Sequence, residues 1–199
     1  MDKALIKLEE ARRDADAVTR ADLAILQAVE PLADHPLIDA VGEAAELADQ
    51  PPLIIASLAT LATGLALRRP GLARAGIGML GAHLAATGIK TLIKDKISRP
   101  RPDIVCEDGE HYLEKDDSDE NEGEEKSFPS GHSAGAVAVA RALVREYPGA
   151  APVAYPLAAT AALIQIPRMS HFPSDVMAGS IIGLIAERLS SAVLRRLMG

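Results

Sequence analysis

The sequence has little of what builds disulfides, zinc sites and aromatic cores. Of its 199 residues only one is cysteine and none is tryptophan, and the aromatic residues together make up 3%. The single cysteine, Cys106, excludes an internal disulfide and a cysteine-rich zinc site. Since alanine, leucine and isoleucine supply most of the 48% that is hydrophobic, the core is predicted to be packed by helices rather than sheets.

The charge is concentrated in one segment, and no basic patch interleaved with aromatics occurs. Residues 107–126 contain eleven Asp or Glu and two Lys, a local charge of −9, so the rest of the chain carries about +2 of the total of −7. Nucleic acid is therefore not expected as a partner. The acidic loop is predicted to be a solvated insertion, and one hypothesis is that it acts as a flap or repels soluble anions.

Five apolar segments follow an amphipathic, charged helix expected within residues 2–30 and a short helix expected at 37–48. The apolar segments cover 52–67, 71–93, 133–144, 151–166 and 176–194. Their lengths straddle the roughly 20 residues that span a bilayer, and they are rich in the small residues that let membrane helices approach closely. The predicted fold class is all-α, an integral-membrane helical bundle of about five apolar helices with an amphipathic N-terminal helix. A soluble helical bundle is the alternative. Residues 1–50 form the predicted N-terminal region, and residues 51–199 the membrane domain.

The turns of such a bundle alternate between its two ends. Turns at 94–131 and 167–175 therefore share one end, and turns at 68–71 and 146–151 share the other. Three polar clusters lie at the first end: KDKISRPRPD with Lys94 and Arg101, PSGH with Ser130, Gly131 and His132, and RMSHFPSD with Arg168, His171 and Asp175. Their convergence predicts an anion site that contains a nucleophile.

Each residue type in these clusters suits phosphate chemistry. Lysine and arginine supply positive charge, and a helix that starts near Ser130 and Gly131 offers free backbone donors to an anion. His171 and Asp175 are one helical turn apart, so the carboxylate can fix the tautomer while the other ring nitrogen attacks phosphorus. His132 can protonate the leaving oxygen. Such a site needs no metal, because fixed cations meet the charge of the phosphoryl group.

In order and spacing, Lys94-x6-Arg101-Pro102, Pro129-Ser130-Gly131-His132 and His171-x3-Asp175 resemble the three signature motifs of the type 2 phosphatidic acid phosphatases. That superfamily also includes bacterial acid phosphatases and vanadium haloperoxidases, and the resemblance covers roughly residues 85–195. It implies His171 as the nucleophile through a phosphohistidine, Asp175 as its orienting partner and His132 as the general acid. It implies phosphate binding by Lys94, Arg101 and Arg168 with help from Ser130 and Gly131, and no cofactor.

The third motif departs from the family pattern at its arginine. The family has Ser-Arg six residues before the nucleophile, where this chain has Ile164 and Gln165, and Arg168 stands three residues before His171. On a regular helix the two positions differ by about 60° and ~4.5 Å, a gap that a long side chain can cover. Lys90, one turn before Lys94, is expected to snorkel to the interface rather than bind substrate.

These features predict metal-independent hydrolysis of a lipid phosphate monoester or diphosphate, with the bilayer and a membrane lipid as partners. Phosphatidate, phosphatidylglycerol phosphate, polyprenyl diphosphates and sphingoid-base phosphates fit equally well. A vanadate-dependent haloperoxidase-like enzyme and a non-catalytic membrane module are the alternatives. The sequence does not indicate an oligomeric state.

A bacterial-type inner membrane with the site facing outward is the expected location. Arg68-Arg69 and Arg195-Arg196 mark the opposite end as cytoplasmic, whereas the four basic residues of the N-terminal segment argue the other way.

Overall fold

The computed structural model describes residues 16–97, 99–108 and 126–198, and these contain helices and no strand. Residues 2–15 of the expected amphipathic helix and residues 109–125 of the acidic loop lie outside the described residues. The α-helices in chain order are α2 (Ala17–Val29), α3 (Pro36–Ala45), α4 (Gln50–Ala66), α5 (Pro70–Lys94), α6 (Pro102–Asp108), α7 (Gly131–Glu146), α8 (Ala151–Leu163) and α9 (Pro173–Met198). Short 3-10 turns follow α2, α3 and α7, at Glu30–Leu32, Glu46–Ala48 and Pro148–Ala150.

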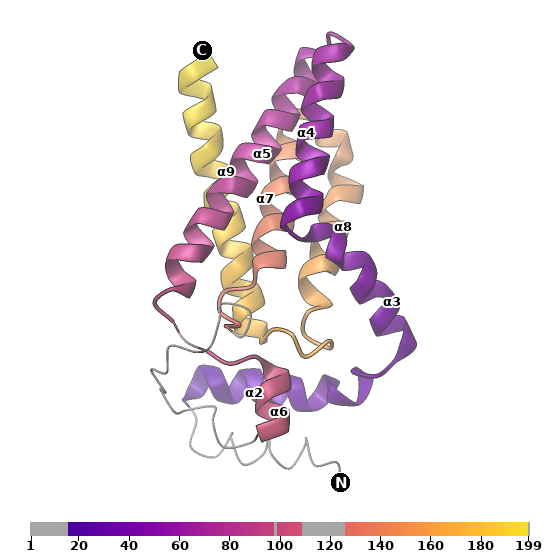
Figure 1. Cartoon of the computed structure of the whole chain (residues 1–199), viewed down its shortest axis with the longest axis vertical. Helices are drawn as coiled ribbons and strands as arrows, with labels where there is room; N and C mark the ends of the chain where they lie inside the picture. The colour runs from indigo at the N-terminus through magenta and orange to yellow at the C-terminus, as the bar shows by residue number, and fades with distance from the viewer. Residues whose placement is uncertain (1–15, 98, 109–125, 199) are drawn as a thin grey trace.

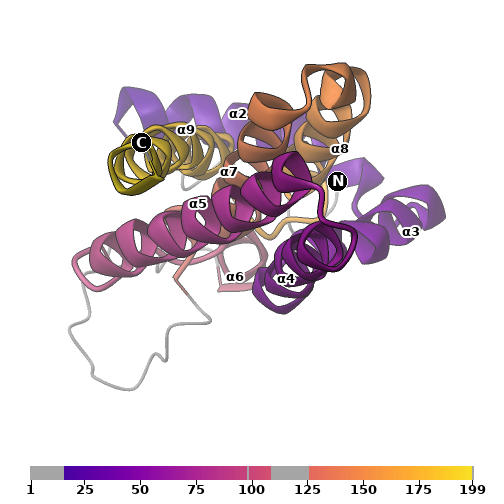
Figure 2. The ribbon, with the colours of Figure 1, turned by 90° about the horizontal axis from the view of Figure 1, so that it is seen from above.

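Each of the five apolar segments forms one helix of an elongated bundle (Figure 1). Helix α7 lies at its centre and contacts α4, α5, α8 and α9 (Figure 2). The core between α5, α7 and α9 is built largely from alanines, with Ala82, Ala86, Ala134, Ala138 and Ala186 almost completely buried. Small side chains at these positions allow the helix axes to approach closely. The short helix α6, within the predicted turn at 94–131, was not expected from the sequence.

Two glycines bring α9 against the first turns of α7. A Cβ on Gly179 would lie 2.3 Å from the carbonyl oxygen of Ser130, and one on Gly183 would lie 2.6 Å from that of Ala134. The two glycines are four residues apart and therefore share one face of α9, the arrangement of close helix pairs in membranes. The polar start of α7 is thus fixed directly against α9.

The outer surface of the bundle is apolar. Helices α5 and α9 are each long and apolar enough to cross a membrane, by length and composition, and α4 is a shorter apolar helix. Large hydrophobic side chains are exposed along the helices, among them Ile55, Leu84, Leu157, Ile181 and Leu189. Such an outer surface suits contact with lipid rather than with water.

Helix α2 crosses the end of the bundle where the polar clusters meet (Figure 1). Its N-cap is Asp16, whose side chain accepts hydrogen bonds from two backbone N–H groups of the first turn, at 2.8 and 3.0 Å. Leu23 and Leu26 are fully buried and belong to a cluster that includes Phe172 of the turn before α9. Asp22 lies on the same buried face, although it is charged.

Candidate active site

His171 lies in the turn that joins α8 to α9, and Asp175 lies in the first turn of α9. The carbonyl oxygen of Gln165 closes this turn by accepting from the backbone N–H groups of Ser170 and His171, both at 3.1 Å. His171 is 4% exposed, and its Nδ1 lies 3.8 Å from Oδ2 of Asp175. That distance exceeds a hydrogen bond, and Nδ1 has no hydrogen-bond partner among the described residues. The carboxylate of Asp175 therefore acts on Nδ1 through its charge rather than through a hydrogen bond. Nε2 is then the ring nitrogen that can attack phosphorus.

Burial sets the protonation state of His171. Loss of hydration disfavours the charged imidazole and lowers its pKa below the usual 6.5, and this effect outweighs the opposing charge of Asp175. The positive charges of Arg101 and Lys94 lower the pKa further. At neutral pH His171 is therefore the uncharged imidazole, the form that can attack phosphorus.

Two donors hold the carboxylate of Asp175. Its Oδ2 accepts from the backbone N–H of Phe172 at 2.9 Å, and its Oδ1 accepts from Nη1 of Arg99 at 2.5 Å. The guanidinium of Arg99 also lies 4.1 Å from the centre of the Phe172 ring. Asp175 is fully buried, so these donors replace the water that an ionised carboxylate requires.

The predicted lysine and arginine of the first motif lie near the histidine. Lys94 is the last residue of α5, Arg101 immediately precedes α6, and both act electrostatically on His171. Lys90 is also directed to this end, because its Nζ lies 3.1 Å from the position that a Cβ of Gly131 would occupy. Its amine therefore lies beside the start of α7, at the end of the bundle where the predicted site residues meet.

The PSGH segment forms the N-terminus of α7. Ser130 is the N-cap, fully buried, and its Oγ accepts from the backbone N–H of Ser133 at 3.4 Å and from the hydroxyl of Ser133 at 2.9 Å. The backbone N–H of Ser130 donates to the carbonyl of Asp175 at 3.1 Å, which ties this turn to α9. The hydroxyl of Ser130 thus caps the helix, and the N–H groups of Gly131 and His132 begin its first turn.

His132 and Arg168 meet at a third residue, Glu46. Nη1 of Arg168 donates to Oε1 of Glu46 at 2.6 Å and to the carbonyl of Gly42 at 3.3 Å. Oε2 of Glu46 lies 3.3 Å from Nε2 of His132. The hydrogen bond from Arg168 lowers the pKa of Glu46 and keeps the carboxylate ionised at neutral pH. The arginine predicted to bind phosphate and the predicted general acid thus share one carboxylate.

Glu46, Asp49 and His132 are the described residues whose side chains come close enough together to hold a metal ion. One carboxylate oxygen of Glu46 is already occupied by Arg168, and His132 is bound to the other. These contacts form an ion-pair network around the carboxylate of Glu46, and we do not assign a metal ion to these residues.

The sequence did not single out Arg99, Asp22 or Glu46. Arg99 belongs to a repeated Arg-Pro pair, 99–100 and 101–102, of which only the second matched the motif spacing. Asp22 carried a usable signal, since it is an acidic residue on the apolar face of an amphipathic helix. Glu46 had no distinguishing signal in the sequence, because it is one of several acidic residues in a charged segment.

Comparison with known proteins gives one family and two similar structures. Residues 75–198 match the model of the PAP2 superfamily. A transmembrane PAP2-type phosphatidylglycerolphosphate phosphatase from Bacillus subtilis is 22% identical, with a TM-score of 0.68 over 97% of this chain and 92% of the other. Aquifex aeolicus LpxE is 23% identical, with a TM-score of 0.62 over 85% of this chain and 94% of the other. No curated protein matches the sequence. The predicted fold, an all-α integral-membrane bundle, is confirmed.

Proposed function

Because the chain belongs to the PAP2 superfamily, we propose that it hydrolyses a phosphate monoester or diphosphate on a membrane lipid. The observation that carries this proposal is the buried His171, whose Nδ1 faces Asp175; burial and the charges of Arg101 and Lys94 lower its pKa. A neutral imidazole with one nitrogen turned to a carboxylate is a nucleophile, and fixed cations suit a phosphoryl group.

The reaction proceeds in two displacements. The lone pair on Nε2 of His171 attacks phosphorus, the bond to the leaving oxygen breaks, and His132 donates the proton that this oxygen takes up. A water molecule then attacks the phosphohistidine while His132 accepts its proton, and the phosphorus–nitrogen bond breaks to release phosphate. Asp175 stabilises the positive charge that develops on the imidazole, and Lys94 and Arg101 bind the phosphoryl oxygens.

The apolar bundle favours a substrate whose hydrocarbon tail stays in the bilayer. The structures with this fold include a transmembrane phosphatidylglycerolphosphate phosphatase, which supports a lipid phosphate as the substrate class. A vanadate-dependent haloperoxidase would use the same oxyanion site, and oxidation of bromide by the vanadate-loaded protein would support it. A non-catalytic module predicts no phosphate release from any substrate.

The test of the proposed function is phosphate release by the detergent-purified protein, with EDTA present, over a panel of lipid phosphates and one soluble ester. Release that survives EDTA is expected. The phosphohistidine is then sought by quenching the reaction in alkali, where the phosphorus–nitrogen bond survives, and by mass spectrometry of the peptide that contains His171. A phosphorylated serine or aspartate in place of the histidine would contradict the mechanism.

The pH dependence of kcat/KM follows from the lowered pKa of His171. The histidine must be neutral to attack, so the acidic limb of the profile reports its pKa in the free enzyme. Since burial moves that pKa below 6.5, activity is expected to persist as the pH falls through 6.5 and to decline about tenfold per unit below the shifted value. An acidic limb above pH 7 would contradict the assignment.

Replacing Arg168 by alanine is expected to lower kcat/KM by roughly tenfold, without abolishing the reaction. Its side chain pairs with Glu46, so it has to exchange this partner for the phosphate before it contributes to binding. Arg188→Ala, at an exposed position of α9, is the matched control and is expected to remain within about twofold of the wild type. A loss of kcat/KM for Arg168→Ala as large as the loss for a variant that lacks the imidazole of His171 would show that no other cation supports the phosphate.

We further propose an inner-membrane location with the site on the outer side. Arg68 and Arg69 lie in the turn between α4 and α5, and Arg195 and Arg196 lie in the last turn of α9. Both pairs are at the end of the bundle away from α2, as basic residues on the cytoplasmic side would be (Figure 1). A cysteine placed at the exposed position 69 (Arg69→Cys, with Cys106→Ser) offers a test, because an impermeant maleimide should label it only in opened cells if this end faces the cytoplasm.

A further inference from the structure

Helix α2 contributes a buried carboxylate to the end of the bundle that holds His171. Asp22 is 3% exposed, and its Oδ1 accepts from the backbone N–H of Ser174 at 2.9 Å. Its Oδ2 accepts from the hydroxyl of Ser174 at 2.5 Å and from Nη2 of Arg99 at 2.6 Å. Asp22 thereby satisfies one of the free N–H groups at the start of α9, one residue before Asp175.

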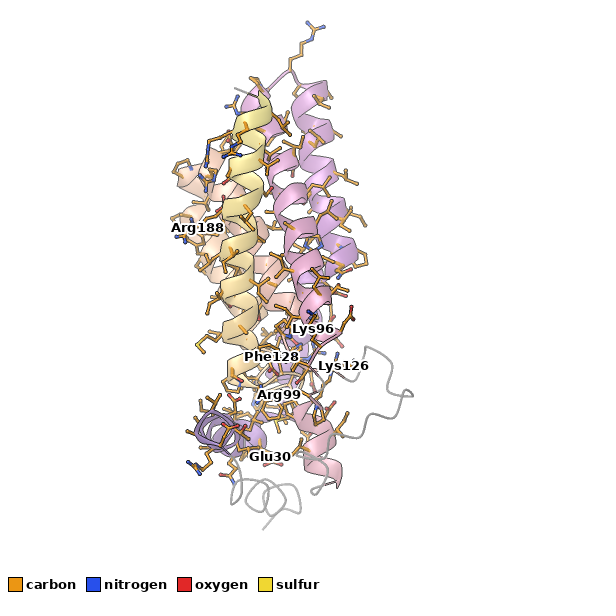
Figure 3. All side chains as sticks on the ribbon, turned by 90° about the vertical axis from the view of Figure 1, so that its left-hand side faces the viewer. Glu30, Lys96, Arg99, Lys126, Phe128 and Arg188 are labelled. Carbon is orange, nitrogen blue, oxygen red and sulfur yellow. The ribbon has the colours of Figure 1, made fainter. Side chains whose placement is uncertain are left out.

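Arg99 joins the two carboxylates. One nitrogen, Nη2, binds Asp22, while Nη1 binds Oδ1 of Asp175 at 2.5 Å and the hydroxyl of Ser174 at 2.7 Å. The guanidinium side chain is 15% exposed and lies between α2 and the first turn of α9 (Figure 3). The fork of an arginine suits this double role because its nitrogens are held in one rigid plane.

The charge of this network decides how well Asp175 can support the histidine. Arg99 alone beside Asp175 would neutralise the carboxylate and weaken its attraction for a positively charged imidazole. Asp22 offsets the charge of Arg99, so that the three groups together keep one negative charge next to His171. Because all three side chains are largely shielded from water, these charges interact strongly.

We propose that Asp22 and Arg99 are positioning residues for the reaction: α2 docks Asp22 against Arg99, and this pair sets the orientation and effective charge of Asp175 at His171. The inference rests on the proposed function for its kinetic consequence. It goes beyond that function because Asp22 lies outside residues 75–198, the part of the chain that matches the family. The N-terminal helix is then part of the catalytic unit rather than a peripheral addition.

Other charges also surround His171. Lys94 from α5 and Arg101 before α6 act on it directly, His132 begins the neighbouring helix α7, and Arg168 stands in the same turn. None of these is changed by a substitution at residue 22 or 99. A difference in the pKa of His171 between variants at these two positions therefore reports the charge of Asp22 and Arg99 alone.

The test compares Asp22→Asn, Arg99→Gln and the double variant, all in the full-length protein. Asp22→Asn leaves Arg99 uncompensated, so the pKa of His171 is expected to fall by about one unit and kcat by roughly tenfold, with KM changed less than about twofold. Arg99→Gln removes the cation, so the pKa of His171 is expected to rise. The double variant restores the charge balance and is expected to return the pKa toward that of the wild type.

The pKa is measured by NMR of ring-labelled histidine in detergent, and in parallel from the acidic limb of kcat/KM. The NMR titration reads the network even if no phosphate is released, so a failure of the proposed function is distinguishable from a failure of this inference. Asp39→Asn, an exposed acid of α3, is the matched control and is expected to change neither quantity. Thermal unfolding of each variant shows whether it is folded.

The proposal is supported if the pKa of His171 shifts in opposite directions in the two single variants and returns toward the wild-type value in the double variant. If Asp22→Asn and Arg99→Gln both lower the melting temperature while His171 titrates as in the wild type, Asp22 serves only to dock α2 and the proposal is overturned. Shifts of the same sign in both single variants would overturn it as well, since they would indicate loss of structure rather than of charge.

Discussion

Replacing His171 by asparagine is expected to reduce phosphate release by at least about 10⁴-fold, to the level left by binding alone. Asparagine keeps a polar side chain of similar size in a site that is 4% exposed, so the turn between α8 and α9 should persist. It has no ring nitrogen with an available lone pair, so no phosphorus–nitrogen bond can form. Phosphate release from the preferred lipid, measured in a single turnover, gives the loss in the chemical step.

His35→Asn is the matched control for this variant. His35 is exposed and is the N-cap of α3, where its Nδ1 accepts from the backbone N–H of Leu37 at 3.1 Å. Asparagine is a favoured N-cap, so α3 is retained and activity should stay within about twofold of the wild type. Comparable rates for His171→Asn and the wild type would remove His171 from the mechanism and favour a different nucleophile.

The arrangement of the fold could be predicted from hydrophobic lengths and turns alone. Each apolar segment became one helix, with ends that differ by a few residues from the expected ones, because long and mostly apolar runs, most of them flanked by prolines, leave few alternatives. The alternation of turns also placed the PSGH segment and His171 at one end, where Ser130 donates to the carbonyl of Asp175. The order of the spanning helices decides which turns lie at the same end of the bundle, and this order can be predicted from the sequence.

Contacts that depend on side-chain reach could not be predicted in this way. The motif spacing selected Arg101 as a phosphate ligand, and it gave no sign that Arg99, two residues earlier, binds Asp175. Arg168 was expected to face the phosphate, and it lies against Glu46 from a segment more than a hundred residues earlier. No local pattern encodes a pairing of this sequence separation. Asp22 was detectable as a charge on an apolar helix face, but its partner was not.

The close contact between α9 and α7 predicts that Gly179→Ala will be strongly destabilising. A Cβ at this position would lie 2.3 Å from the backbone carbonyl oxygen of Ser130 and 3.1 Å from Cβ of Ser133. A backbone oxygen at the start of a helix cannot turn aside as a flexible side chain can, so α9 has to move away from α7. We expect a loss of about 3 kcal/mol or more in the free energy of unfolding, measured by denaturant titration in detergent.

Gly88→Ala on α5 provides the control, because no atom of the described residues outside the local helix backbone lies within 4 Å of the added Cβ. Alanine is the better helix former, so this variant should be neutral or more stable by up to about 1 kcal/mol. Gly179→Ala should also lose activity in the fraction that remains folded, because the displaced carbonyl belongs to the N-cap of α7 and the moving helix carries Asp175. Full activity in Gly179→Ala would mean that His132 and His171 tolerate a change in the spacing of α7 and α9. The position of the general acid relative to the nucleophile would then be set by the turns that carry them, and not by the packing of the two helices.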